Sequence, residues 1–81
     1  MSFDDRTIQL VWEKGKPIPK YSEAIWRRDF KGRVIKREDH GNRRSKYGWE
    51  VHHIISKAKG GSDNLSNLTP LQWEMNVELG G

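Results

Sequence analysis

The sequence has 81 residues, of which 33% are hydrophobic and 32% are charged, and its formal net charge is +4. This length allows one small domain with a thin core. The absence of cysteine excludes disulfides and thiolate zinc sites, so any metal would be bound through nitrogen and oxygen atoms. No apolar run reaches the length of a membrane span and no signal-peptide pattern opens the chain, so we expect a cytoplasmic protein without a membrane partner.

Charge is distributed unevenly along the chain. Residues 27–46 contain nine Lys or Arg and three acidic residues, whereas no Lys or Arg follows Lys59. A basic segment is typical of proteins that bind polyanions. It is equally typical of a solvated surface that aids solubility, so charge alone leaves both interpretations open.

The first 20 residues predict one strand. We expect residues 1–6 to be a loose terminus and the β-favouring segment TIQLVWEKG, residues 7–15, to form a strand. Two prolines in residues 16–20 argue against a regular element there, because proline lacks the N–H donor and has a fixed φ.

The basic segment predicts a hairpin followed by a loop. Apolar pairs flank the turn sequence Asp29-Phe30-Lys31-Gly32 within residues 24–38, which favours a hairpin. A short helix over residues 22–30 is the alternative. Residues 39–48 are polar with two glycines and predict a loop.

The C-terminal half predicts a strand, a long loop, a short strand and a helix. Residues 49–55 read as the first strand, and residues 56–67 as a loop with Gly60-Gly61 at a turn. A loop of this length in so small a domain is usually functional. Leu68-Thr69 is expected to be the short second strand.

The final helix is predicted over residues 69–81. Thr69 is the expected N-cap, Pro70 suits the first helical position, and Gln72 completes a capping box. Leu68 and Trp73 are spaced to form a hydrophobic staple across this start, and two glycines end the helix.

Four polar residues of this half are candidates for a functional site. His52 and His53 are adjacent on the predicted strand, where successive side chains point to opposite faces, so the two imidazoles are expected to have different roles. Asn67 closes the loop. Asn76 lies in the middle of the helix, where asparagine is unfavourable, which indicates another reason for its presence. Taken alone, two histidines are more often structural or surface residues.

The segment from Trp49 to Asn76, WEVHHIIS…GGSDNLSNLTPLQWEMN, resembles the HNH endonucleases. The shared features are the His-His-Ile strand, the Gly-Gly loop, Asn-Leu, and a helix carrying asparagine. The resemblance implies an α+β fold: a small ββα-metal (HNH) domain with an N-terminal β-rich extension. It implies one nuclease domain over residues 1–81 with its core motif at residues 49–79, and fits a phage or bacterial source.

The resemblance also implies roles for the candidate residues. His52 and Asn76 would bind one divalent metal ion, His53 would activate water, and Asn67 would brace the loop. The implied reaction is hydrolysis of DNA phosphodiester bonds, by nicking or double-strand cleavage, leaving a 5′-phosphate and a 3′-hydroxyl. The metal could be zinc, nickel, manganese, cobalt or magnesium. Softer ions are favoured because His52 stands where relatives often have aspartate.

DNA is the implied partner, held through its phosphate backbone. The expected phosphate contacts, called the five cations below, are Arg43, Arg44, Lys46, Lys57 and Lys59. Sequence specificity is expected to be weak unless the chain forms an oligomer or joins a larger assembly. Glu50 is expected to be exposed and unrelated to the site, the alternative being a charge that supports a site residue, and His40 is expected to be a loop residue. The alternatives are a nucleic-acid-binding module that lacks catalysis and a structural zinc site.

Overall fold

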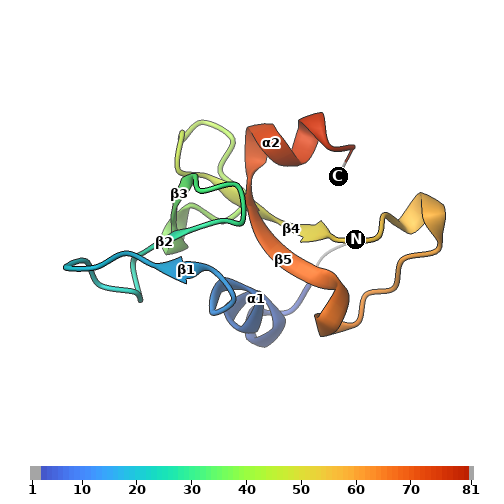
Figure 1. The fold of residues 1–81 in the computed structure, drawn as a ribbon, viewed down its shortest axis with the longest axis horizontal. Coiled ribbons are helices and arrows are strands. Elements are labelled where there is room, and N and C mark those ends of the chain that lie inside the picture. Colours follow the sequence, from blue (N-terminus) through green and yellow to red (C-terminus); the bar gives the residue numbers. More distant parts are fainter. Residues whose placement is uncertain (1–2, 81) are drawn as a thin grey trace.

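The protein, described for residues 3–80 in a computed structural model, contains two small antiparallel sheets and two helices. Figure 1 shows the two-stranded sheet in the middle of the molecule, with one helix on each side and the three-stranded sheet at one end. This arrangement confirms the α+β prediction. Within the described residues, neither helix has the length and apolar character that a membrane span requires.

The N-terminal element is a helix, so the strand predicted over residues 7–15 is wrong. Helix α1 spans Asp5–Trp12, and the Asp4 side chain caps it by accepting a hydrogen bond from the backbone N–H of Thr7 at 2.8 Å. Ile8, Val11 and Trp12 are buried on one face. This helical spacing and the cap outweigh the β propensity of the individual residues. The loose terminus expected over residues 1–6 lies partly outside the described residues, and Asp5 already belongs to the helix.

The predicted hairpin is confirmed, and the alternative helix over residues 22–30 is wrong. Strand β2 (Trp26–Arg28) pairs with β3 (Val34–Lys36) around the expected turn. A third strand, β1 (Lys16–Pro17), pairs with β2 although two prolines argued against any element there. It lies at the edge of the sheet, where a missing proline N–H is tolerated. The N-terminal extension, predicted to be rich in strands, is therefore a helix followed by a small sheet.

The central sheet contains β4 (Trp49–His53) and β5 (Leu68–Gln72). The predicted first strand is confirmed with an earlier end, and the second strand is five residues long rather than two. Across the pair, His52 lies opposite Thr69 and His53 opposite Leu68. The loop between them contains two single-turn 3₁₀ helices, Lys57–Lys59 and Leu65–Asn67.

Helix α2 spans Trp73–Glu78, so the predicted start at Thr69 is wrong. Thr69 and Pro70 belong to β5, and the expected capping box and the staple between Leu68 and Trp73 do not form. Gln72 is the N-cap, and its Oε1 accepts hydrogen bonds from the backbone of residues 74 and 75. Full-length pairing with β4 keeps the chain extended for four residues beyond the local start signal.

The hydrophobic core lies between α1, the central sheet and β3. The residues of its buried cluster are Ile8, Val11, Trp12, Ile35, Trp49 and Leu68. The rings of Trp12 and Trp49 contact each other with centroids 5.3 Å apart. Because Trp49 opens β4 and is fully buried, the strand that carries both histidines is anchored in the core.

Candidate active site

Strand β4 presents its polar side chains in two directions. Glu50 and His52, two residues apart, both form hydrogen bonds with Asn76 of α2. His53 instead contacts Asp63 in the loop after the strand. The two histidines therefore have different surroundings, as strand alternation predicts.

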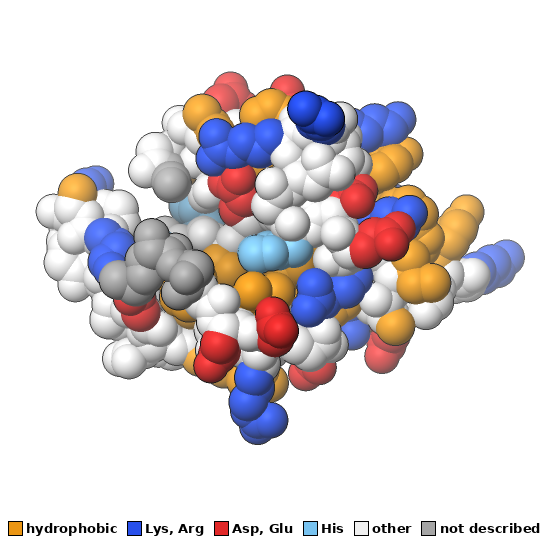
Figure 2. All heavy atoms as spheres, turned by 180° about the vertical axis from the view of Figure 1, so that it is seen from behind, with side chains coloured by type: hydrophobic (Ala, Val, Ile, Leu, Met, Phe, Trp, Pro, Cys, Tyr) orange, Lys and Arg blue, Asp and Glu red, His pale blue; other side chains and the backbone are white. Residues whose placement is uncertain are grey.

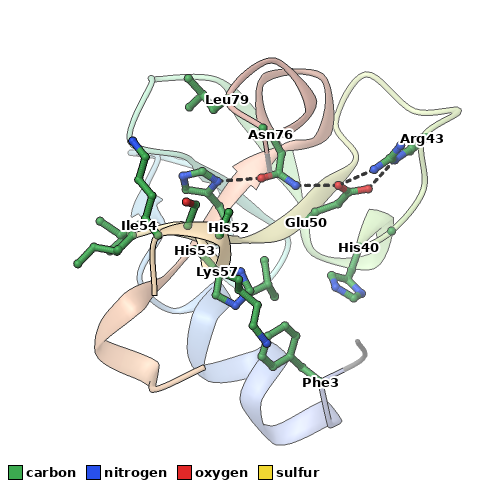
Figure 3. A pocket seen from close by; sticks show the side chains of 17 residues that line it. Phe3, His40, Arg43, Glu50, His52, His53, Ile54, Lys57, Asn76 and Leu79 are labelled. Atoms are coloured by element: carbon green, nitrogen blue, oxygen red, sulfur yellow. Dashed lines mark hydrogen bonds and ion pairs between the residues drawn. The ribbon is translucent and has the colours of Figure 1, made fainter. Parts of the chain in front are cut away.

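His52 and Asn76 meet in a buried position. Nδ1 of His52 lies 2.8 Å from Oδ1 of Asn76, and the two residues are 8% and 3% exposed. Nδ2 of Asn76 donates to Oε1 of Glu50 at 2.9 Å. Because an ionised carboxylate only accepts hydrogen bonds, Glu50 fixes the orientation of the amide and turns its oxygen toward His52. Figure 3 shows this chain of contacts from His52 through Asn76 to Glu50 and Arg43.

Glu50 is part of the site, so the expectation that it is exposed and unrelated is wrong. Its side chain is 18% exposed and forms two hydrogen bonds with Arg43, at 2.7 and 3.0 Å. The hydrogen bond from Arg43, followed by that from Asn76, holds the pKa of Glu50 below its ordinary value. Glu50 is therefore ionised at neutral pH and holds Arg43 at the rim of the site.

Asn67 connects the two ends of the loop. Its Oδ1 accepts a hydrogen bond from the backbone N–H of Ile55 at 2.8 Å, and its Nδ2 donates to the carbonyls of Ile55 and Ser62 at 3.0 and 2.8 Å. Gly61 lies against this bridge, where a Cβ would collide with the Ile55 carbonyl. These contacts agree with a bracing role for Asn67, which stays a prediction.

His53 is held by an acidic residue that the sequence did not single out. Its Nε2 lies 2.7 Å from Oδ1 of Asp63, and Nζ of Lys57 lies 3.3 Å from Oδ2 of the same carboxylate. The hydrogen bond from His53 is the largest cause that lowers the pKa of Asp63. Asp63 lies two residues after the glycine pair, and only the folded loop brings it to the strand.

A pocket of about 1110 Å³ opens beside these residues and is lined by both histidines and Asn76. Of the five cations, Arg43, Lys57 and Lys59 line this pocket, whereas Arg44 and Lys46 lie outside its lining. On the face shown in Figure 2, basic side chains are interspersed with acidic ones and do not form one continuous patch. The structure thus gathers three of the five cations at the candidate site.

His40 also lines the pocket, although the sequence predicted only a loop residue. Its ring meets the Trp49 ring edge-on, with centroids 4.8 Å apart, and burial lowers its pKa. The sequence contains a usable signal for Glu50, which precedes His52 by two residues on a strand and so shares its face. It contains no comparable signal for His40 or Asp63, because loop closure places both.

The comparisons with known proteins agree with this geometry. The HNH endonuclease family model matches residues 36–74, which include both histidines and Asn67 and end two residues before Asn76. The probable mobile endonuclease C of Enterobacteria phage T4 is 50% identical over 32 residues, which cover 40% of this chain and 15% of that protein. The chain therefore corresponds to a small part of this relative. No solved structure gives a significant match. The family match, supported by the phage relative, places residues 36–74 of this chain in the HNH endonuclease family.

Proposed function

We propose that residues 1–81 act as one nuclease domain that hydrolyses DNA phosphodiester bonds with the help of one divalent metal ion. The observation that carries the proposal is the pairing of His52 and Asn76, beside a second histidine, at the wall of an open pocket. HNH nucleases generally use a divalent metal, and both of these side chains have donor atoms that such ions accept.

The donor set fits a metal ion. Nδ1 of His52 and Oδ1 of Asn76 are 2.8 Å apart, close enough for both atoms to face one ion. Because the amide oxygen only accepts, Nδ1 of His52 donates to it in this structure, and metal binding at Nδ1 would require the other tautomer of the ring. A bound divalent ion would supply Lewis-acid stabilisation of the phosphate and of the leaving oxygen. Two protein ligands leave room for water and phosphate oxygens.

We assign the proton transfer to His53. The histidine takes a proton from water, the water oxygen bonds to phosphorus, and the bond from phosphorus to the 3′ oxygen breaks. The leaving oxygen then takes a proton from solvent. A neutral imidazole has one unprotonated ring nitrogen that can accept this proton. The products carry a 5′-phosphate and a 3′-hydroxyl.

Phosphate binding is assigned to the five cations, with Arg43, Lys57 and Lys59 nearest the reacting bond. Arg43 is favoured because Glu50 already fixes its guanidinium. These contacts carry no sequence information directly, so the domain should cut with weak sequence specificity. An oligomer or larger assembly would be the source of stronger specificity.

The choice of metal follows from the ligands. Neither His52 nor Asn76 carries a formal negative charge, and imidazole suits zinc, nickel and cobalt better than magnesium. We therefore propose that manganese, nickel, cobalt or zinc support faster cleavage than magnesium.

One assay tests the proposal and its alternative, a binding module without catalysis. Supercoiled plasmid, linear duplex and single strands are incubated with the protein and each metal, and products are separated by electrophoresis. Metal-dependent nicking or linearisation that EDTA abolishes supports the nuclease. Salt-sensitive DNA binding without cleavage in any metal would favour the binding module.

A further inference from the structure

The contact between His53 and Asp63 determines which ring nitrogen of His53 carries a proton. The carboxylate of Asp63 has acceptor atoms only, so Nε2 of His53 must donate to Oδ1 across the 2.7 Å contact. In the neutral ring, Nδ1 then carries the lone pair. Within residues 3–80, Nδ1 of His53 makes no hydrogen bond. It is therefore the nitrogen left to accept a proton.

Asp63 is itself held in place from two directions. Oδ1 faces His53, and Oδ2 lies 3.3 Å from the ammonium of Lys57. The backbone before it is fixed because Asn67 donates to the carbonyl of Ser62 at 2.8 Å. At 33% exposure, the Asp63 side chain is partly shielded from water. The carboxylate is thus positioned by the loop and does not sample the solvent freely.

We propose that Asp63 is a positioning residue for His53: it fixes the rotation of the ring and keeps the tautomer in which Nδ1 accepts the proton from water. This inference rests on the proposed nuclease function. It assigns a purpose to the braced loop, because the bonds made by Asn67 hold the segment that delivers Asp63 to the strand.

The ammonium of Lys57 makes Asp63→Asn an informative substitution. Lys57 only donates hydrogen bonds, so it draws the amide oxygen of the variant toward itself. The amide NH₂ then faces Nε2 of His53 and donates to it, which moves the ring proton to Nδ1. We expect this variant to lose roughly 10- to 100-fold in kcat, the usual cost of removing a group that orients a functional histidine, with KM changed less than twofold.

Three comparison variants make the kinetic test specific. Asp63→Glu keeps a carboxylate and should recover part of kcat. Glu78→Gln removes one negative charge from an exposed position and should leave kcat unchanged, which separates positioning from charge. In the His53→Ala background, adding Asp63→Asn should change the rate no further.

The outcomes separate a positioning role from a structural one. If Asp63→Asn lowers kcat by the same factor in the wild-type and His53→Ala backgrounds and also lowers the melting temperature, Asp63 only stabilises the loop. This result would overturn the inference. An unaltered kcat would overturn it as well. Failure of the wild type to cut DNA with any metal would refute the nuclease function itself.

The tautomer can be measured without any cleavage. Long-range ¹H–¹⁵N correlation spectra of the metal-free protein distinguish the two neutral forms of His53. We expect the Nε2–H form in the wild type and the Nδ1–H form in Asp63→Asn. Observation of the Nδ1–H form in the wild type would contradict the inference even if the protein cuts DNA normally.

Discussion

Removing the Asn67 side chain should lower both stability and activity. Asn67 is 9% exposed, and its side chain makes three hydrogen bonds to backbone groups of Ile55 and Ser62. In Asn67→Ala these groups lose their partners, and a buried polar group without a partner costs about 1–3 kcal/mol. Ile55 is 57% exposed, so water replaces part of what is lost there. We therefore expect a total near 1–3 kcal/mol rather than three times that amount.

This loss of free energy corresponds to a measurable decrease in melting temperature. For a domain of this size, 1 kcal/mol corresponds to about 4–8 °C, so Asn67→Ala should melt about 4–24 °C below the wild type in circular dichroism. Cleavage should fall at temperatures where the variant is still folded, because the loop that ends beside His53 is no longer fixed. Plasmid cleavage at 20 °C measures this second effect.

Two further variants sharpen the comparison. Asn67→Asp keeps the acceptor for the Ile55 N–H but places a carboxylate against two carbonyl oxygens, so it should be at least as unstable as the alanine variant. Asn64→Ala changes an exposed asparagine of the same loop and serves as the matched control, with an unchanged melting temperature. An Asn67→Ala protein with the melting temperature and the activity of the wild type would refute the bracing role.

Four other outcomes are expected. His53→Ala should lower cleavage by roughly 10²–10⁴-fold while DNA binding, measured by fluorescence anisotropy, is retained; near wild-type cleavage would exclude it as the base. Neutralising the five cations one at a time should flatten the log–log salt dependence of DNA affinity by about one unit per phosphate contact, and an unaltered slope after all five would leave them a solubilising role. His52→Asp should shift the preferred metal toward magnesium in a cleavage panel, and no shift would argue against His52 as a ligand. The pKa of Glu50 lies below its ordinary 4.5, so ionised Glu50 stabilises the fold above that pH, and this contribution is lost as the pH falls through the lowered pKa. The free energy of unfolding of Glu50→Gln, measured by chemical denaturation, should therefore fall less steeply than that of the wild type between pH 6 and pH 3.

The sequence predicted the hairpin and the order of the elements after residue 48, because its signals there are local. The hairpin turn, the first strand and the glycine pair all follow from short-range chemistry. The strand predicted over residues 7–15 was wrong because the prediction followed the β-branched and aromatic residues there. The spacing of Ile8, Val11 and Trp12, which is typical of a helix, was the better signal. The start of α2 was misplaced because pairing across five residues of β4 overrides a capping box.

The partners of the site residues were harder to predict than the residues themselves. His52, His53, Asn67 and Asn76 were identified from a spaced pattern. The contact between His53 and Asp63 depends on the path of a ten-residue loop segment, which no periodicity encodes. Likewise, Arg43 was expected to contact phosphate, and the sequence did not predict the ion pair that it forms with Glu50.

Strand β5 passes into α2 without an intervening loop, since Gln72 ends the strand and caps the helix. The same residue is tied to the distant hairpin, because its backbone N–H donates to Oδ2 of the buried Asp29 at 2.9 Å. Each residue of an α-helix advances the direction of its side chain by about 100°. One inserted or deleted residue between Gln72 and Asn76 would therefore swing the amide away from His52, however well the rest folded. Relatives of this chain should vary in length within the loop after β4 and keep a constant length across this junction.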